Sequence, residues 1–245
     1  MKRLVIYFFL IYLFAWKIVG WGNLANAATL TTQAKNILTT ELHNHKITKQ
    51  FQIDEIRCLA ENIYFEARAE SEVGKAAVGN TTKNRVLHTN WPNTYCEVVK
   101  QGPVRESWKT RGKDVKDEDR VYWPIKHRCQ FSWYCDGKKD VIWANYEKTG
   151  QTIEGNARAW RDSVELAIYI TGFGKLTIDD NTHGALYYYN HNLVYPHWAD
   201  AMISIGVEGN HTFMKEGKLS VSYTHLRAHE TPEHRVLRGG GGKKK

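Results

Sequence analysis

The sequence predicts an α+β domain that is mainly helical and carries a small β element. Three segments, at about 54–68, 73–88 and 157–171, repeat apolar residues at the three- and four-residue steps of an α-helix. An aromatic run at 186–189 favours a strand, because large rings fill a pleated surface well. Several helices with a few short strands indicate a single α+β domain.

The first 27 residues resemble an export signal. A basic start precedes an apolar run over residues 4–16, and residues 25–27 read Ala-Asn-Ala, the small residues that a signal peptidase accepts. Lys17 interrupts the run well short of the ~20 apolar residues that a membrane span needs. We therefore expect cleavage after Ala27 rather than an uncleaved anchor, and no stable membrane insertion afterwards.

The last residues, 218–245, lack apolar periodicity and read as a disordered, non-native tail. The histidines in this tail are therefore not expected to bind a metal. Most of the formal charge of +8 also comes from the two ends, since residues 28–217 carry 24 basic and 24 acidic side chains. A neutral folded part argues against a nucleic-acid-binding protein.

About 190 residues remain between the two ends, which is enough for one domain with a substantial core. An even number of cysteines behind an export signal predicts two disulfides and an oxidising location: the periplasm, the cell wall or the extracellular space. Three pairings are possible, and a zinc site built from all four cysteines lacks the short paired spacing of zinc knuckles. The cysteines are Cys58, Cys96, Cys129 and Cys135.

The elements of this domain can be assigned in order. Residues 28–53 look like a spacer or a short peripheral helix, and the domain proper spans 54–217. Asp54 is a natural N-cap for the first helix. In the second helix Gly79 would let a neighbouring helix approach closely, and the polar stretch 102–120 is expected to be an exposed loop.

Glu66 is the first candidate for chemistry. Ile56, Leu59, Ile63 and Ala67 define one apolar face of the first helix, and Glu66 lies beside that face. A carboxyl group in such a place can hold its proton near neutral pH and serve as a general acid. The competing interpretation is a solvated residue at the edge of the helix.

Motifs along residues 54–215 resemble the cell wall hydrolase family of spore cortex-lytic enzymes, the SleB/CwlJ type. The chain departs from the family pattern at Ala69, where glycine is usual, and at residues 80–82, which are more polar. The segments that carry the resemblance are Cys58–Glu70, Asn84-Arg85-Val86, Trp91–Thr94, Cys129–Trp133, Asp136-Gly137, Ala185–Asn190, Pro196-His197-Trp198 and Gly209–Phe213.

The resemblance implies a lysozyme-like catalytic fold and an enzyme that cleaves peptidoglycan glycan strands. We expect it to act as a monomer, without a cofactor or a metal. It places the general acid on Glu66, which would protonate the oxygen between N-acetylmuramic acid and N-acetylglucosamine. In a lytic transglycosylase the same group then accepts the proton of the muramyl 6-hydroxyl, and no second carboxylate is needed. Hydrolysis would call for a second carboxylate, for which Glu70 and Asp136 are the candidates.

Aromatic and polar side chains are expected to build the rest of a saccharide site. Sugar rings stack their C–H faces on aromatic rings, and their hydroxyls need polar partners. In a strand, Tyr187 and Tyr189 share one face and Tyr188 points to the other. The candidate substrate-binding residues are Gln130, Phe131, Ser132, Trp133, Tyr188, Asn190 and Trp198.

Two other functions remain open from the residues alone. A zinc-dependent N-acetylmuramoyl-L-alanine amidase could use His183, His191, His197 and His211, although no close ligand motif is present. A non-catalytic module could instead bind peptidoglycan with the same aromatic residues and would not need a half-buried Glu66.

Overall fold

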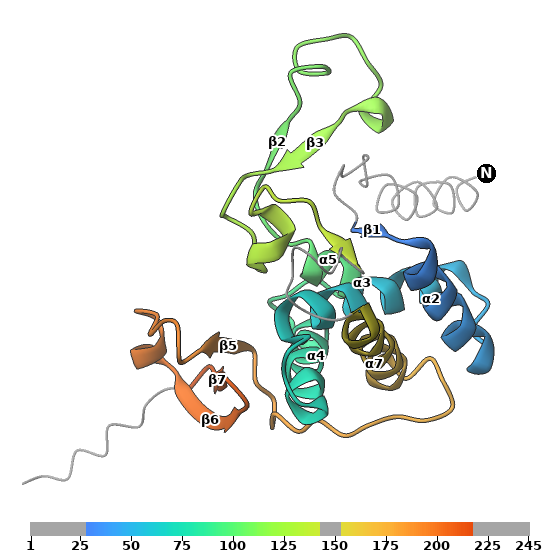
Figure 1. The fold of residues 1–245 in the computed structure, drawn as a ribbon. Helices are drawn as coiled ribbons and strands as arrows, with labels where there is room; N and C mark the ends of the chain where they lie inside the picture. Colours follow the sequence, from blue (N-terminus) through green and yellow to red (C-terminus); the bar gives the residue numbers. More distant parts are fainter. Residues whose placement is uncertain (1–27, 143–152, 218–245) are drawn as a thin grey trace, which may run out of the picture.

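Helices and short strands alternate through the chain, as the α+β prediction expects. The computed structural model describes residues 28–142 and 153–217 (Figure 1). The predicted export signal and the predicted tail lie outside the described residues. Within the described residues, no helix is both long enough and apolar enough to cross a membrane.

Residues 28–53 belong to the folded unit. Strand β1 (Thr29–Leu30) pairs in parallel with β4 (Val141–Ile142), and helix α2 (Thr32–Asn44) follows it. The side chain of Thr31 caps α2 by accepting a hydrogen bond from the Ala34 amide at 3.4 Å. Three apolar side chains of α2 are buried against α7, so the segment predicted as a spacer or peripheral helix contributes to the core.

Helix α3 (Gln50–Ala67) starts four residues before the predicted N-cap, Asp54. Ile53 packs on the core and so extends the apolar face toward the N-terminus. The Asp54 carboxylate therefore lies inside the helix, where it accepts a hydrogen bond from the Gln50 side chain at 2.9 Å.

Helix α4 (Glu72–Leu87) follows after a short turn, and its first turn is capped by Ser71, whose hydroxyl accepts from the Gly74 amide at 3.0 Å. A methyl group at Gly79 would collide with Ile63 of α3 and with Ile170. The close helix contact predicted at Gly79 is confirmed.

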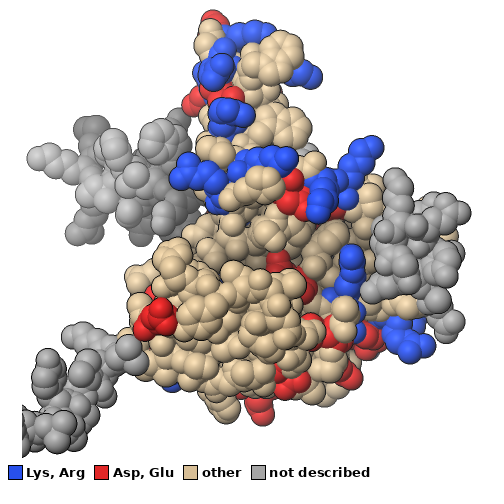
Figure 2. Space-filling model, turned by 60° about the vertical axis from the view of Figure 1, so that its left-hand side comes forward, with Lys and Arg blue, Asp and Glu red and all other residues tan. Residues whose placement is uncertain are grey.

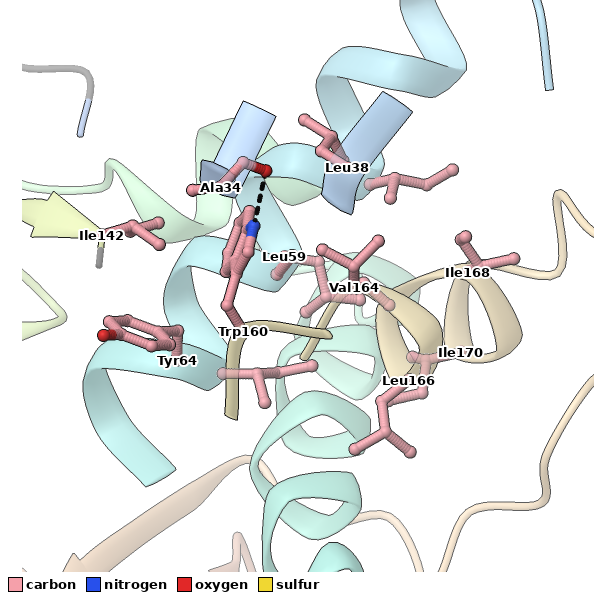
Figure 3. Packing of buried hydrophobic residues seen from close by; sticks show 14 of the residues in the cluster. Ala34, Leu38, Leu59, Tyr64, Ile142, Trp160, Val164, Leu166, Ile168 and Ile170 are labelled. Carbon is pink, nitrogen blue, oxygen red and sulfur yellow. Dashed lines mark hydrogen bonds between the residues drawn. The ribbon is translucent and has the colours of Figure 1, made fainter. Parts of the chain in front are cut away.

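Helix α7 (Ile153–Thr171) lies against α2, α3 and α4 and completes the main core. Trp160 is fully buried there, and its indole N–H donates to the Ala34 carbonyl at 2.9 Å, which ties α2 to α7 (Figure 3). Tyr64 of α3 meets Trp160 edge-on. Burying rings of this size accounts for much of the hydrophobic stabilisation.

A disulfide between Cys58 and Cys96 joins α3 to α5 (Tyr95–Val99). The chain beyond α5 forms an arm of two antiparallel strands, β2 (Val104–Glu106) and β3 (Tyr122–Pro124), joined by a loop that contains the short helix η1 (Asp117–Asp119). The predicted loop at 102–120 thus contains strand β2 and the connecting loop of a hairpin that projects from the helices (Figure 1). Lys and Arg side chains gather on this arm (Figure 2).

A three-stranded antiparallel sheet ends the described chain, with the order β5 (Tyr187–Asn190), β7 (His211–Lys215), β6 (Ile203–Glu208). Phe213 and Tyr188 pack from this sheet against Ala67 of α3 and against α4. The predicted strand at 186–189 is confirmed within one residue, whereas β6 and β7 were not predicted. The α+β class is confirmed.

Candidate active site

A cavity of about 500 Å³ lies where α3, α4, the residues before η2 (Ser132–Cys135) and β5 meet. Its walls come from segments far apart in the sequence, so only the folded chain assembles it. The lining residues are Glu66, Arg85, Gln130, Phe131, Ser132, Tyr187, Tyr188, Trp198 and Met202.

Glu66 reaches this cavity from the last turn of α3. Its side chain is half-buried, and the Tyr188 hydroxyl donates a hydrogen bond to Oε2 at 3.2 Å. Loss of solvent raises the pKa of Glu66 to about 7, although the Tyr188 hydrogen bond and the positive charge of Arg85 each lower it. Glu66 can therefore exist in both protonation states near neutral pH.

No second carboxylate lines the cavity in the described part of the chain. Glu70, one turn beyond Glu66, points instead to the β6–β7 turn. Its two oxygens accept hydrogen bonds from Asn210, from the backbone amide at 3.1 Å and from Nδ2 at 2.8 Å. Asp136 lies in the turn after η2, where it accepts from the Lys138 amide at 2.7 Å.

Arg85 enters the cavity from the last turn of α4 and was not among the predicted site residues. It is only 3% exposed, and its Nε donates to the Leu186 carbonyl at 2.7 Å. Burial lowers the pKa of Arg85 to about 10. Its position could have been inferred, because Arg85 follows Val78 and Thr82 by helical steps and so falls on the face of α4 that packs inward.

Three aromatic rings surround the Arg85 guanidinium. The centroids of Trp91, Phe131 and Tyr187 lie 4.5, 5.0 and 5.9 Å from its central carbon. Phe131, Gln130 and Ser132 were all predicted site residues, and all three line the cavity. Phe131 is buried, and its neighbours Gln130 and Ser132 are exposed. Contacts of this kind between a cation and aromatic faces stabilise the buried charge.

Alternation along β5 separates the three tyrosines as predicted. Tyr188 faces Glu66 and packs edge-on against His211 at 5.2 Å between ring centroids. Tyr187 and Tyr189 face the other way, and each lies 5.8 Å from the Trp198 ring. These three rings are half-buried; Tyr187 and Trp198 line the cavity, and Tyr189 extends this aromatic surface beyond it.

Two predicted substrate-binding residues lie away from the cavity. Trp133 is buried in the core, where it stacks on Phe65 at 4.6 Å and donates its indole N–H to Asn62 at 3.0 Å. Asn190 accepts a hydrogen bond from the Asn192 amide at 3.0 Å and shapes the turn that follows β5. A short-range motif cannot tell Phe131 from Trp133, because both rings are buried and only the folded chain shows that Phe131 lines the cavity and Trp133 does not.

Potential metal ligands do not converge. In residues 28–142 and 153–217, no three His, Cys, Asp or Glu side chains come close enough together to hold a metal ion. Of the four histidines of the zinc alternative, His211 is buried beside Tyr188, and the other three, His183, His191 and His197, are exposed. This part of the chain therefore contains no set of zinc ligands that would support the amidase alternative.

The model of the Cell Wall Hydrolase family matches residues 69–214. Glu66 lies just before the matched segment, and the other residues that line the cavity lie within it. No curated protein matches the chain significantly.

Two solved structures are similar at low identity. The catalytic domain of the Bacillus cereus SleB protein is 22% identical, with 66% of this chain and 89% of that chain covered and a TM-score of 0.37. The catalytic domain of the germination-specific lytic transglycosylase SleB from Bacillus anthracis is 22% identical, with 69% of this chain and 98% of that chain covered and a TM-score of 0.38.

Proposed function

The chain belongs to the cell wall hydrolase family, and we propose that it cleaves the glycosidic bond between N-acetylmuramic acid and N-acetylglucosamine with Glu66 as general acid and base. The observation that carries this proposal is a carboxyl group with a pKa near 7 at the wall of a cavity large enough for sugar rings. A group of this kind can donate a proton and take one back at the same pH.

The first step moves the Glu66 proton to the glycosidic oxygen while the bond from that oxygen to C1 of the muramyl residue breaks. The Tyr188 hydroxyl already occupies Oε2, which leaves Oε1 to carry the transferred proton. In the second step the ionised Glu66 accepts the proton of the muramyl 6-hydroxyl, whose oxygen bonds to C1. The product is a 1,6-anhydro sugar, and Glu66 regains its proton.

The surroundings of Glu66 favour transglycosylation over hydrolysis. A hydrolase of the usual kind needs a second carboxylate to activate water or to act as a nucleophile. Within the described chain, Glu66 is the only carboxylate that lines the cavity. The aromatic surface of Tyr187, Tyr189 and Trp198 supplies faces on which sugar rings can stack.

Digestion of purified peptidoglycan tests this function. Mass spectrometry of the soluble fragments should find 1,6-anhydro-muramyl ends, and a chelator should not change them. Reducing sugar ends would instead identify a hydrolase, and free peptides that disappear with chelator would identify a metal amidase.

Substitution of the proposed acid provides the second test. Loss of a general acid slows catalysis by roughly 10²–10⁴-fold, so the Glu66→Gln protein should lose turnover while it keeps binding the glycan. Asp136→Asn is the matched control, because Asp136 lies outside the cavity. Full activity of the Glu66→Gln protein would refute the proposed role and favour a binding module.

Export is the second part of the proposal. Both pairs of cysteines are joined, Cys58 to Cys96 and Cys129 to Cys135, which supports an oxidising location. Fusion of residues 1–27 to a periplasmic reporter should direct its export, and N-terminal sequencing should find cleavage after Ala27. A reporter retained in the cytoplasm would contradict this.

A further inference from the structure

Arg85 carries a buried positive charge that no carboxylate neutralises by direct contact. Among the described residues, no acidic oxygen lies within 4.0 Å of its guanidinium. Its one hydrogen bond from Nε goes to a backbone carbonyl, and the buried Nη1 has no hydrogen-bond partner. Buried arginines usually pair with a carboxylate or a phosphate, so this arrangement calls for an explanation.

The fold of the cavity does not supply the missing partner. Aromatic faces enclose the guanidinium on several sides, and they stabilise a cation without accepting its hydrogen bonds in full. Glu66, on the same cavity, carries a proton for much of the time near neutral pH. When Glu66 is ready to act as an acid, the cavity therefore holds one uncompensated positive charge.

We propose that Arg85 binds a carboxylate of the glycan substrate. This inference rests on the proposed function, and it names the chemical class of substrate that the cavity selects. Two parts of peptidoglycan can provide the group: the lactyl carboxylate of a muramyl residue without a stem peptide, or a free carboxylate of the stem peptide. Both would form charge-assisted hydrogen bonds with the guanidinium.

Binding of an anion to Arg85 would also prepare Glu66 for proton donation. The positive charge of Arg85 favours the ionised form of Glu66. A bound carboxylate would cancel much of that field, so Glu66 would keep its proton when substrate is present. Substrates that carry the anion would then gain in the rate of the chemical step as well as in affinity.

The direct test changes the ligand and leaves Arg85 intact. Calorimetry with the Glu66→Gln protein should compare two ligands. The first is a GlcNAc–MurNAc tetrasaccharide with free lactyl carboxylates, and the second is the same tetrasaccharide with each lactyl carboxylate converted to a methylamide. We expect the amide to bind at least about tenfold more weakly, as expected when one charge-assisted hydrogen bond to a buried donor is lost. Equal affinities for the carboxylate, the amide and chitotetraose would exclude the lactyl group as the source. The proposal would be overturned if a muropeptide also bound equally with free and with amidated peptide carboxylates.

A muropeptide distinguishes the two sources of the carboxylate. Its lactyl group is already an amide, so tight binding that is lost after amidation of the peptide carboxylates would assign the group to the stem peptide. Weak binding of the muropeptide together with tight binding of the stripped tetrasaccharide would assign it to the lactyl arm.

Variants of Arg85 test the same contact from the protein side. Arg85→Lys should keep part of the preference for the carboxylate ligand, and Arg85→Gln should abolish it. Circular dichroism and a melting curve would establish that each variant folds, because the Nε contact with Leu186 also supports the chain before β5. A folded Arg85→Gln protein with an unchanged preference would refute the proposal.

These experiments distinguish a failure of the Arg85 proposal from a failure of the proposed function. Loss of anhydro products from the wild-type protein would count against glycan cleavage, whatever the ligand preference. Normal anhydro products with equal binding of the charged and neutral ligands would count against Arg85 alone.

Discussion

Burial sets the pH range of the proposed acid by raising the pKa of Glu66 to about 7, and the hydrogen bond from Tyr188 moderates that rise. Since Glu66 must be protonated to start the reaction, kcat/KM should fall as the pH rises through about 7. The Tyr188 hydroxyl lowers the pKa of Glu66, so Tyr188→Phe should shift this fall to higher pH. A pH profile of kcat/KM measures the shift.

The neighbouring tyrosine provides the control for this experiment. The Tyr187 hydroxyl donates to Glu216 at 2.9 Å and does not contact Glu66. Tyr187→Phe should therefore leave the alkaline limb in place. Equal shifts in both variants, or none in Tyr188→Phe, would show that the Tyr188 hydrogen bond does not control the acid.

The Glu66 carboxyl group also makes the free energy of unfolding depend on pH. The pKa of Glu66 is about 7 in the folded chain against an ordinary value of 4.5 for a glutamate, so the folded state holds the proton more tightly. The resulting stability is complete below about pH 4.5 and is lost as the pH rises through 7. Glu66→Gln removes this loss, and the variant should gain about 1–3 kcal/mol relative to wild type between pH 5 and pH 8.

Urea unfolding of both proteins at the two pH values measures that gain. Parallel pH dependence in the variant and the wild type would mean that Glu66 does not hold its proton in the folded state. A stabilised but inactive variant would indicate that the fold tolerates an unfavourable group in order to retain its chemistry.

Single residues were predictable where a local pattern places them against the core. Glu66 follows from the face of one helix, and Phe131 and Tyr188 follow from motifs and alternation. Arg85 was missed because its partners, Trp91, Phe131 and Tyr187, come from three other segments. Helical spacing places Arg85 on the inward face of α4, but no window of neighbouring residues shows which rings it meets there.

Among the elements, the two disulfides are expected to stabilise the fold to different extents. The Cys58–Cys96 bond closes a loop with a sequence separation of 38, whereas Cys129–Cys135 spans 6. Loop-closure entropy gives losses of about 4 kcal/mol and about 2 kcal/mol when each pair is replaced by alanine. Urea unfolding of the two double variants should therefore rank Cys58/Cys96 as the more destabilised.

Activity provides the complementary measurement for these variants. Cys129 and Cys135 flank a short segment whose residues Gln130, Phe131 and Ser132 line the cavity. Loss of this short bridge should reduce activity more than its effect on stability suggests. If the Cys58/Cys96 variant were instead as stable as wild type, the joint between α3 and α5 would not depend on its disulfide.

The long helices were predicted well because 3.6-residue periodicity is a property of each segment alone. The start of α3 was missed by four residues, since the contact of Ile53 with the core outweighs the capping preference of Asp54. Strands β2 and β3 have only three residues each, which is too short to show an alternation that could be recognised. Such strands depend on their pairing, which the sequence alone does not display.

At the scale of the whole molecule, the cavity depends on how the sheet docks on the helices. Asn84 of α4 joins the two parts by donating to the Asp180 carboxylate at 3.0 Å and to the Ala185 carbonyl at 3.1 Å. Glu70 forms the second joint through its two hydrogen bonds from Asn210. Both joints fix β5, and with it Tyr188, relative to Glu66.

Glu70→Gln tests whether Glu70 holds the sheet or takes part in catalysis. Its side chain is only 8% exposed, and the amide would place a donor against the Asn210 donors. We expect a loss of about 1–3 kcal/mol in the free energy of unfolding. Activity should fall only about threefold to tenfold, on the order of 1 kcal/mol in transition-state free energy, and the alkaline limb of the pH profile should stay in place.

Glu208→Gln is the control for that experiment, because Glu208 lies in the same junction and its carboxylate accepts an exposed hydrogen bond from the Ser71 hydroxyl at 3.4 Å. It should change neither stability nor activity appreciably. A Glu70→Gln protein with wild-type stability and a loss of activity above about 100-fold would show the opposite, since that size of effect belongs to a catalytic carboxylate. The enzyme would then use two acidic groups, and water would become the expected nucleophile in place of the muramyl 6-hydroxyl.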